Sequence, residues 1–417
     1  MSASNRQVVV IGGGAIGAAC AYYLCRAGCT VTLLERDRFG KGCSHGNCGF
    51  ISPSHVLPLA EPGLVGKVLK SLFHRKSPFR VQPRFDLNLW AWLLQFARRC
   101  NRTHLLAGGR AIQPLLASSR RLYDELMAAE LTDCEWHTQG VLFVFRSVVE
   151  MEAYAESDRL LRDEFGVASY RLSSAEVEAR EPALKPGMVG AFHYPGDAHL
   201  RPDKLMAAWR RALEARGVTI REHCPLTGFV GPGDTARAAA TPAGEFPGDA
   251  FVLATGAWTP LLREAIGRSV PIQPGKGYSI TMPRPRLCPS LPLIFPEHKV
   301  AITPMDSGYR IGSTMEFAGY DATLNSQRLA FLRESAALYL REPLAEPVLE
   351  EWFGWRPMTY DSLPIIDRSP RWANVWITAG HNMLGISMSP ATGKLVSELI
   401  TGQPPHLDPR PYALSRF

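Results

Sequence analysis

Three glycines near the N-terminus have the spacing that a nucleotide-binding turn requires. Gly12, Gly14 and Gly17 follow the apolar run 8–11 in the pattern G-x-G-x-x-G, with Ile16 inside it. The first glycine permits a tight turn, the second lets the backbone approach a pyrophosphate, and the third lets a helix pack closely on a strand. The pattern indicates a dinucleotide site, and the alternative is a glycine-rich turn without a ligand.

The residues that follow complete a strand, turn, helix and strand. Residues 18–27 are strong helix formers, and Gly28 is expected to end the helix that they form. Residues 31–34 form a second apolar run. Glu35 closes that run about 20 residues past the glycines, where a carboxylate accepts the hydroxyls of an adenosine ribose. Arg36 comes next, but the Glu35 carboxylate would repel the 2′-phosphate of NADP. The segment therefore leaves NAD and FAD as alternatives.

The whole chain is long enough for this unit and a second domain. It has 417 residues, of which 46% are hydrophobic and 20% are charged, and a formal net charge of +7. Its basic residues are dispersed, which favours anionic small molecules or an acidic membrane surface only weakly and predicts no nucleic-acid partner. No apolar run approaches the roughly 20 residues of a membrane-spanning helix, and residues 1–6 leave no room for a signal peptide.

The nine cysteines indicate free thiols in a reducing compartment. They are odd in number, too sparse for a disulfide scaffold, and form no C-x-x-C pair, so we expect a cytoplasmic protein without a metal site. Cys43 and Cys48 lie in the glycine-rich loop 40–54, whose small residues suit backbone contact with a flat or charged ligand. We interpret both as small residues packed beside a ligand, with a redox pair as the alternative.

Apolar periodicity predicts the elements that must position these residues. Helices are expected at 85–100, 111–130, 147–165, 202–216 and 389–400, and strands at 140–145, 217–221, 251–254 and 375–378. Segment 64–76 has one apolar face and is otherwise basic, which fits a surface helix or, alternatively, weak contact with a membrane. Segments suited to nucleotide binding recur at both ends and in the middle, which predicts one domain interrupted twice by another.

Motifs along nearly the whole chain resemble those of the D-amino acid oxidase-like FAD oxidoreductases. In order, they are residues 7–36, GNCGFISP, LATGAW, GWRPMTYDSLPIID and TAGHNMLGISMSPATGKLVSELI. Within that family the chain looks like the bacterial D-amino acid dehydrogenases and hydroxy-D-proline dehydrogenases. The resemblance implies an α/β fold in which a Rossmann-like FAD-binding domain carries an inserted α+β substrate domain built on an antiparallel sheet. The FAD-binding domain would take residues 1–84, 171–262 and 351–417, and the substrate domain residues 85–170 and 263–350.

The resemblance also implies FAD as the cofactor and assigns residues to it. The three glycines would hold the pyrophosphate, and Glu35 would hold the ribose. The other cofactor positions carried over are Ile16, Arg36, Ser44, Asn47, Cys48, Gly49, Thr255, Gly256, Trp258, Gly380, His381, Asn382, Met383, Leu384, Gly385, Ile386 and Ser387. Amides of residues 380–387 would stabilise charge on reduced flavin, with an ordinary strand-to-helix turn as the alternative. Related sarcosine oxidases hold flavin on a cysteine near position 356, where this chain has none, so we expect noncovalent FAD.

Arg356, in the motif G-W-R-P-M-T, matches the carboxylate-binding arginine of that family. A guanidinium meets a carboxylate with two parallel hydrogen bonds, which would aim the α-hydrogen of a substrate at the flavin. The alternative for Arg356 is a structural ion pair. Tyr278 in KGYSI is expected either to close the same pocket or to belong to the core. Many relatives carry a second anchor after the histidine, where this chain has Asn382 and Met383, so the second anchor is unassigned.

The reaction implied by the resemblance is hydride transfer from the α-carbon of a D-amino or cyclic imino acid, such as D-proline or hydroxy-D-proline, to flavin N5. No general base stands out, and His55, His199 and His381 are expected to be structural. The electron acceptor would be a quinone or oxygen, with weak attachment to the inner membrane through residues 64–76 as a further hypothesis. Three alternatives stay open: a glycine-, sarcosine- or L-proline-type amine oxidase, an NAD-dependent dehydrogenase, and a noncatalytic flavin-binding protein.

Overall fold

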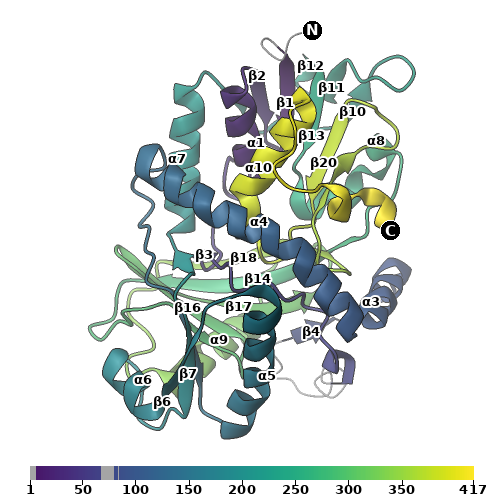
Figure 1. Ribbon diagram of the computed structural model, residues 1–417. Helices are drawn as coiled ribbons and strands as arrows, with labels where there is room; N and C mark the ends of the chain where they lie inside the picture. The colour runs from purple at the N-terminus through teal and green to yellow at the C-terminus, as the bar shows by residue number, and fades with distance from the viewer. Residues whose placement is uncertain (1–5, 67–78, 83) are drawn as a thin grey trace.

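Two sheets and the helices that cover them make up the protein. The computed structural model describes residues 6–66, 79–82 and 84–417 (Figure 1). One sheet has six strands in the order β19-β20-β13-β1-β2-β9, and another has nine, in the order β18-β14-β17-β16-β15-β5-β7-β6 with β4 beside β17. In Figure 1 the six-stranded sheet lies in the upper part, the nine-stranded sheet lies in the lower part, and α4 crosses in front of both. The predicted α/β fold with a second, antiparallel sheet is confirmed.

The six-stranded sheet is parallel except at one edge. Its strands are β1 (Gln7–Ile11), β2 (Thr30–Leu34), β9 (Thr219–Arg221), β13 (Ala250–Leu253), β19 (Ile365–Arg368) and β20 (Val375–Ala379). β1 runs parallel to both β2 and β13, and only β19 is antiparallel to its neighbour. Helix α1 (Ala15–Arg26) connects β1 to β2, and Gly28, with a φ of 86°, lies just past its end. The carboxyl ends of β1, β2 and β13 therefore lie side by side at one edge of this sheet.

Helix α1 lies directly on this sheet, and three longer helices pack on α1 or on one another. Helix α10 (Gly385–Thr401) packs on α1 and on α4 (Arg102–Ala129), and α7 (Pro202–Ala215) packs on α1. Helix α4 begins earlier than predicted because the Asn101 side chain accepts a hydrogen bond from the His104 amide. Helix α10 also begins earlier, at Gly385, despite Pro390 in its second turn. The carbonyl of Ile386, which lacks the usual amide partner, accepts a hydrogen bond from the Tyr123 hydroxyl at 2.8 Å instead.

The nine-stranded sheet is mostly antiparallel. Its strands are β4 (Phe79–Val81), β5 (Val141–Phe145), β6 (Tyr170–Ser173), β7 (Gly190–Tyr194), β14 (Ile272–Met282), β15 (Leu293–Phe295), β16 (Val300–Met305), β17 (Gly308–Phe317) and β18 (Glu350–Thr359). The register of β14 against β17 shifts between Lys276 and Tyr278, so that Thr314 and Met315 of β17 form a bulge opposite Gly277. Helix α9 (Ser326–Tyr339) packs on β14, β16 and β17.

Strand pairing bears on where one domain ends and the other begins. Strands β6, β7 and β18 pair within the nine-stranded sheet, although the predicted boundaries at 171 and 351 assign most of their residues to the FAD-binding domain. Sequence alone does not reveal such pairing, because the partners lie far apart along the chain. The division into two discontinuous domains remains a proposal, and the pairing favours boundaries after Tyr194 and after Thr359.

The remaining elements are shorter or lie at the edges of the molecule. They are β3 (Phe50–Ile51), β8 (Ala198–His199), β10 (Gly228–Val230), β11 (Ala238–Thr241), β12 (Gly244–Pro247), and the helices α3 (Leu87–Arg99), α5 (Val148–Phe165), α6 (Ser174–Arg180) and α8 (Arg263–Ile266). Of the segment 64–76, only residues 64–66 are among those described. No helix in the described ranges is long and apolar enough to cross a bilayer.

Candidate functional site

The glycine turn between β1 and α1 is built around two contacts and one open position. Gly12 has a φ of 114°, and a Cβ there would lie 2.4 Å from the carbonyl oxygen of Ala254. A Cβ on Gly17 would lie 1.8 Å from the carbonyl oxygen of Gly12. At Gly14 the nearest atom would be Ser44 Oγ, at 3.4 Å. Gly12 and Gly17 are therefore required by the protein's own packing, whereas Gly14 leaves space for a ligand.

Glu35 lies at the end of β2 beside this turn. Its Oε2 accepts a hydrogen bond from the Gly13 amide at 2.7 Å, and its Oε1 accepts one from the Asp37 amide at 2.9 Å. Each carboxylate oxygen keeps a further lone pair for a ligand hydroxyl. The next residue, Arg36, places its guanidinium carbon 4.0 Å from the ring centre of Trp258. The structure thus brings Glu35 and Arg36 next to the turn after β13.

That turn carries three of the predicted cofactor residues. The Trp258 amide donates to the carbonyl of Thr255 at 3.0 Å, and Gly256 between them has a φ of 54°. The Trp258 ring packs against Trp355 with ring centres 4.7 Å apart. Thr255 and Gly256 follow Ala254, whose carbonyl approaches Gly12, so they lie at the same sheet edge as the glycine turn.

Loop 43–49 connects this turn to the nine-stranded sheet. Ser44 Oγ accepts a hydrogen bond from the Ala15 amide at 3.0 Å, at the first turn of α1. Within the loop, Asn47 Oδ1 accepts from the Gly49 amide at 2.7 Å. Cys48 reaches the other sheet, where its carbonyl accepts from the hydroxyl of Thr303 at 2.6 Å. The loop therefore touches both sheets.

A buried arginine that the sequence analysis did not identify holds the same loop. Arg310 on β17 is 1% exposed. Its NH1 donates to the carbonyl of Asn47 at 2.8 Å, and its Nε donates to the Thr281 hydroxyl at 2.9 Å. Its nearest carboxylates, on Asp203 and Glu350, are each 3.9 Å away. No local motif marks Arg310, because its partners lie in distant segments.

The turn after β20 is fixed beside β18. Asn382, with a φ of 52°, donates its amide to the carbonyl of Pro357 at 3.1 Å, and its Oδ1 accepts from the Thr359 amide at 2.9 Å. Ser387 Oγ donates to the carbonyl of Phe50 at 2.8 Å, just past loop 43–49. The predicted segment 380–387 therefore lies between β18 and the end of that loop, and its last three residues, 385–387, form the first turn of α10.

Within this segment the two best-placed polar side chains have structural partners. His381 is buried with Nε2 3.2 Å from the Thr392 hydroxyl, and burial lowers its pKa to about 3, so the ring is neutral. Asn382 is used by the hydrogen bonds to β18, whereas Met383 is exposed. Burial also lowers the pKa of His55 and of His199 to about 4. The three rings are therefore uncharged at neutral pH, and their structural role stays a prediction.

Arg356 lies on β18 opposite Gly275 of β14. Its guanidinium extends over Gly277, where a Cβ would be 2.4 Å from Arg356 Cζ. One nitrogen, NH1, donates to the carbonyl of Thr314 at 2.7 Å, and burial lowers the pKa of Arg356. Among the described residues no carboxylate pairs with Arg356, and the titratable neighbours that act on it are the Cys43 and Cys48 thiols. The site therefore has an unpaired, partly buried cation, which favours an anionic ligand.

The two thiols identify the face of the sheet on which Arg356 lies. A Cβ on Gly312 of β17 would be 2.7 Å from Cys48 Sγ, and one on Gly354 would be 3.3 Å from Cys43 Cα. Burial raises the pKa of both thiols, that of Cys43 to about 11. Protonated, half-buried thiols are poor nucleophiles, so their environment favours packing over a redox role. All nine cysteines are free, and no metal-ligand cluster occurs among the described residues.

The structure does not bring Tyr278 to Arg356. Successive side chains of a strand point to opposite faces, so Tyr278 lies on the face opposite the one where Gly277 meets the guanidinium. Tyr278 is 1% exposed in a hydrophobic cluster, and its hydroxyl donates to Glu316 Oε2 at 2.6 Å. The prediction that Tyr278 closes the pocket is therefore wrong, and the alternative of a core tyrosine is correct.

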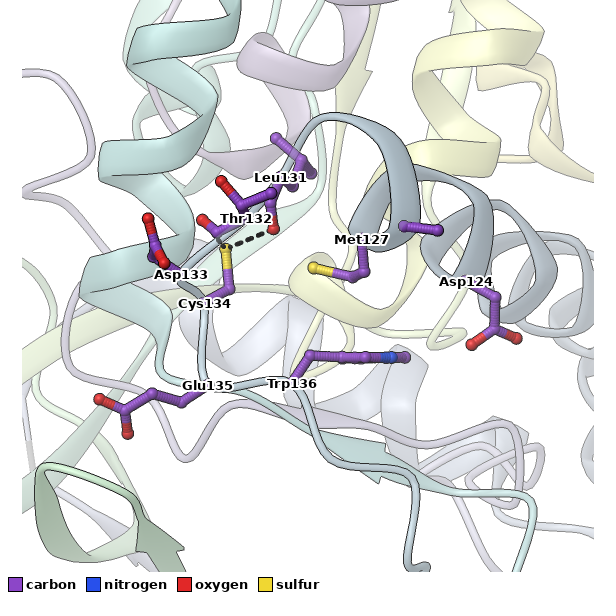
Figure 2. Close-up of a pocket in the computed structure, with 9 residues that line it drawn as sticks. Asp124, Met127, Leu131, Thr132, Asp133, Cys134, Glu135 and Trp136 are labelled. Carbon is purple, nitrogen blue, oxygen red and sulfur yellow. Dashed lines mark hydrogen bonds between the residues drawn. The ribbon is translucent and has the colours of Figure 1, made fainter.

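A hollow on the surface lies apart from these residues, at the carboxyl end of α4 (Figure 2). It is lined by Asp124, Met127, Ala128, Leu131, Thr132, Asp133, Cys134, Glu135 and Trp136. The thiol that lines the hollow has a hydrogen-bond partner, since Cys134 Sγ donates to the carbonyl of Leu131 at 3.2 Å. None of the predicted site residues lines it, so it is not part of the candidate site.

Family comparison defines the class of protein. Residues 7–399 match the family described as FAD dependent oxidoreductase, so the chain belongs to the DAO family of FAD-dependent oxidoreductases. A protein of Granulibacter bethesdensis named D-amino acid dehydrogenase is 33% identical over 421 residues, which cover 99% of each chain. A protein of the same name from Methylobacterium nodulans is 34% identical over 412 residues, which cover 96% of each chain.

Solved structures of the same fold are more distant in sequence. Glycine oxidase from Geobacillus kaustophilus superimposes with a TM-score of 0.80 at 22% identity, covering 99% of both chains. L-proline dehydrogenase from P. horikoshii gives a TM-score of 0.72 at 21% identity, covering 99% of this chain and 98% of that one. These likenesses confirm the fold.

The residues present fit FAD. Helices α1 and α10 both begin without a side-chain cap at the N-cap position and without an acidic residue in the first turn. Unsatisfied amides and the positive end of a helix dipole are suited to bind an anion. Gly14 leaves α1 open to a pyrophosphate, and α10 begins beside Phe50, the residue that follows loop 43–49. Loop 43–49 lies between the two helix ends.

Proposed function

We propose that this enzyme dehydrogenates a D-amino acid or a cyclic imino acid such as D-proline or hydroxy-D-proline. The observation that carries the proposal is the unpaired guanidinium of Arg356, on the sheet face that carries loop 43–49. A substrate carboxylate would supply the missing negative charge with two parallel hydrogen bonds. The names of the relatives at 33–34% identity give independent support for an amino-acid substrate.

The residues of the chain would orient the substrate and keep its amine neutral. Bound FAD would accept a hydride from the substrate α-carbon. The carbonyl of Thr314 fixes one edge of the Arg356 guanidinium, so the remaining N–H groups face a defined direction. The positive charge of Arg356 also disfavours a neighbouring ammonium, which promotes the free amine that can donate hydride. No separate general base is needed for this step.

Noncovalent attachment of FAD is part of the proposal. Cys43 and Cys48 are the thiols nearest Arg356 that the structure identifies, and burial keeps both protonated. Acid precipitation should therefore release all flavin into the supernatant. A yellow protein pellet after precipitation would contradict noncovalent binding.

The substrate class is tested by anaerobic bleaching of the purified yellow protein. We expect bleaching by D-amino acids or D-proline and not by their L-enantiomers. The second candidate, a glycine-, sarcosine- or L-proline-type oxidase, is favoured by the structural likeness to glycine oxidase. Rapid bleaching by glycine, sarcosine or L-proline alone would support that candidate. Yellow protein that no amine bleaches would indicate a noncatalytic flavoprotein.

We further propose a quinone as the electron acceptor and weak contact with an anionic membrane on its cytoplasmic side. Most of the segment 64–76 lies outside the described residues, but α3 offers separate support. Leu87 and Trp90 on α3 are 80% and 53% exposed, Leu94 follows on the same side, and Phe85 just before the helix is fully exposed. Arg98 in the last turn adds positive charge near this apolar side.

Vesicle sedimentation tests the membrane proposal. The protein should sediment with anionic vesicles at low salt and be released at high salt. A Leu87→Ser/Trp90→Ser double variant should bind vesicles several-fold more weakly with unchanged bleaching by substrate. A native protein that never sediments and that reduces oxygen rapidly would contradict both the membrane contact and the quinone.

A further inference from the structure

Two consecutive residues of β17, one beside the bulge and one in it, have a backbone conformation that their side chains disfavour. Ser313 has a φ of 108° and Thr314 a φ of 57°. Glycine is usual in this region, and a β-branched residue such as threonine is a clear outlier there. The neighbouring strands impose the conformation, since Ser313 is paired with both Tyr278 and Val300. Strained residues of this kind concentrate at ligand-binding sites.

The bulge turns the Thr314 carbonyl toward Arg356. That carbonyl accepts a hydrogen bond from Arg356 NH1 at 2.7 Å. A guanidinium has five N–H donors, so one bond to a carbonyl leaves a complete edge for a carboxylate. Thr314 is therefore in direct contact, through its backbone, with the guanidinium that would bind an anion.

The Thr314 side chain is buried and has no partner. Thr314 is 3% exposed, and its Oγ1 makes no hydrogen bond to any described residue. Buried hydroxyls in folded proteins are nearly always hydrogen-bonded, because an unpaired one has lost its bonds to water. The unpaired hydroxyl and the strained backbone belong to the same residue, and that residue touches Arg356.

We propose that the Thr314 hydroxyl is the second anchor of the substrate carboxylate, to which it donates a hydrogen bond beside Arg356. The inference rests on the proposed amino-acid substrate and names a residue that determines specificity for an acid. The same bulge residue would orient the guanidinium through its carbonyl and bind the carboxylate through its hydroxyl. The anchor expected after His381, where the chain has Asn382 and Met383, would then be supplied by β17.

Thr314→Val tests the hydroxyl because it keeps the branched shape and the backbone constraint. Losing one hydrogen bond to a carboxylate should lower kcat/KM for the best amino acid about ten- to a hundredfold, mainly through KM. The dissociation constant of benzoate, a carboxylate without an amine, should rise by a similar factor when read from the flavin absorbance. Thr314→Ser should restore both values to within a few-fold of native.

Ser313→Ala is the matched control, since Ser313 shares the strained backbone beside the bulge but has no assigned role. It should change both values by less than about threefold. Equal losses in Ser313→Ala and Thr314→Val would attribute the effect to the bulge and overturn the proposal. If Thr314→Val does not retain flavin, Thr314→Ala is used instead, because it removes the same hydroxyl. Whichever of the two variants retains flavin, native affinity for benzoate in that variant would overturn the proposal.

The outcome separates this inference from the proposed function. If Arg356→Ala loses activity and benzoate binding while Thr314→Val keeps both, only the second anchor is wrong. If the native protein binds no benzoate and oxidises no amino acid, the substrate class itself is wrong, and the inference fails with it.

Discussion

Arg356 and Gly277 lie on adjacent strands so close together that a single methyl group at position 277 would collide with the guanidinium. A Cβ at Gly277 would be 2.4 Å from Arg356 Cζ, NH1 and NH2. The absent side chain allows the guanidinium to lie across β14 and reach the carbonyl of Thr314. Gly277→Ala should therefore displace Arg356 and lower kcat/KM about tenfold or more, with flavin retained. Native kinetics in this variant would show that the guanidinium does not act from this position.

Direct substitution of Arg356 separates its charge from its shape. Lysine keeps the charge but loses the fork, so Arg356→Lys should lower kcat/KM about ten- to a hundredfold. Arg356→Ala should lower it further, because the substrate carboxylate would be buried without a positively charged partner. Flavin content, measured beside kcat/KM, should stay native in both. Near-native kcat/KM for the alanine variant would leave Arg356 as a structural residue.

Gly14 and Gly17 should respond differently to substitution. Gly14→Val adds a side chain where only Ser44 Oγ approaches, so the protein should fold but lose most of its flavin. Gly17→Ala places a Cβ 1.8 Å from the Gly12 carbonyl and should destabilise the fold itself. Thermal unfolding and flavin absorbance distinguish the two effects. Full flavin occupancy in Gly14→Val would move the pyrophosphate site elsewhere.

Tyr278→Phe should affect stability and not catalysis. The change removes the hydrogen bond that Tyr278 donates to Glu316, and Glu316 is itself 4% exposed. Leaving a buried acceptor short of a partner should lower the free energy of unfolding by about 1–3 kcal/mol. Urea unfolding measures this loss, while kcat/KM should remain within about twofold. A large loss of kcat/KM with unchanged stability would return Tyr278 to the active site.

His381 predicts a pH dependence of stability. Burial lowers its pKa in the folded state to about 3, from an ordinary value of 6.5. Its contribution is fully present above pH 6.5 and is lost as the pH falls toward 3, since only the unfolded state takes up the proton. Between neutral pH and about pH 5 this amounts to about 2 kcal/mol. In urea unfolding, His381→Gln should lose less stability than the native protein over that pH interval. An equal loss in both proteins would show that another group causes the pH dependence.

The features that the sequence predicts correctly are those built from neighbouring residues. The glycine turn, α1 and Glu35 lie within one strand-turn-helix-strand unit, where spacing determines geometry. The position of Tyr278 could not be predicted from the sequence, because which face of its strand lies on the Arg356 side depends on the strands that pair with it. Arg310 and Thr314 were missed for a similar reason. Arg310 bonds to Asn47, 263 residues away in the sequence, and Thr314 matters only because a register shift brings it to Arg356.

Loop 43–49 is bonded to α1 through Ser44 and to the nine-stranded sheet through Arg310 and Thr303. A cofactor lying along this loop would therefore be enclosed only when both sheets are in contact. The affinity for FAD should then depend on the contact between the two sheets as well as on the glycine turn. Substitutions inside the nine-stranded sheet, remote from every nucleotide contact, should therefore weaken FAD binding. Their first detectable effect should be release of FAD on dilution, seen as loss of the yellow colour of the protein.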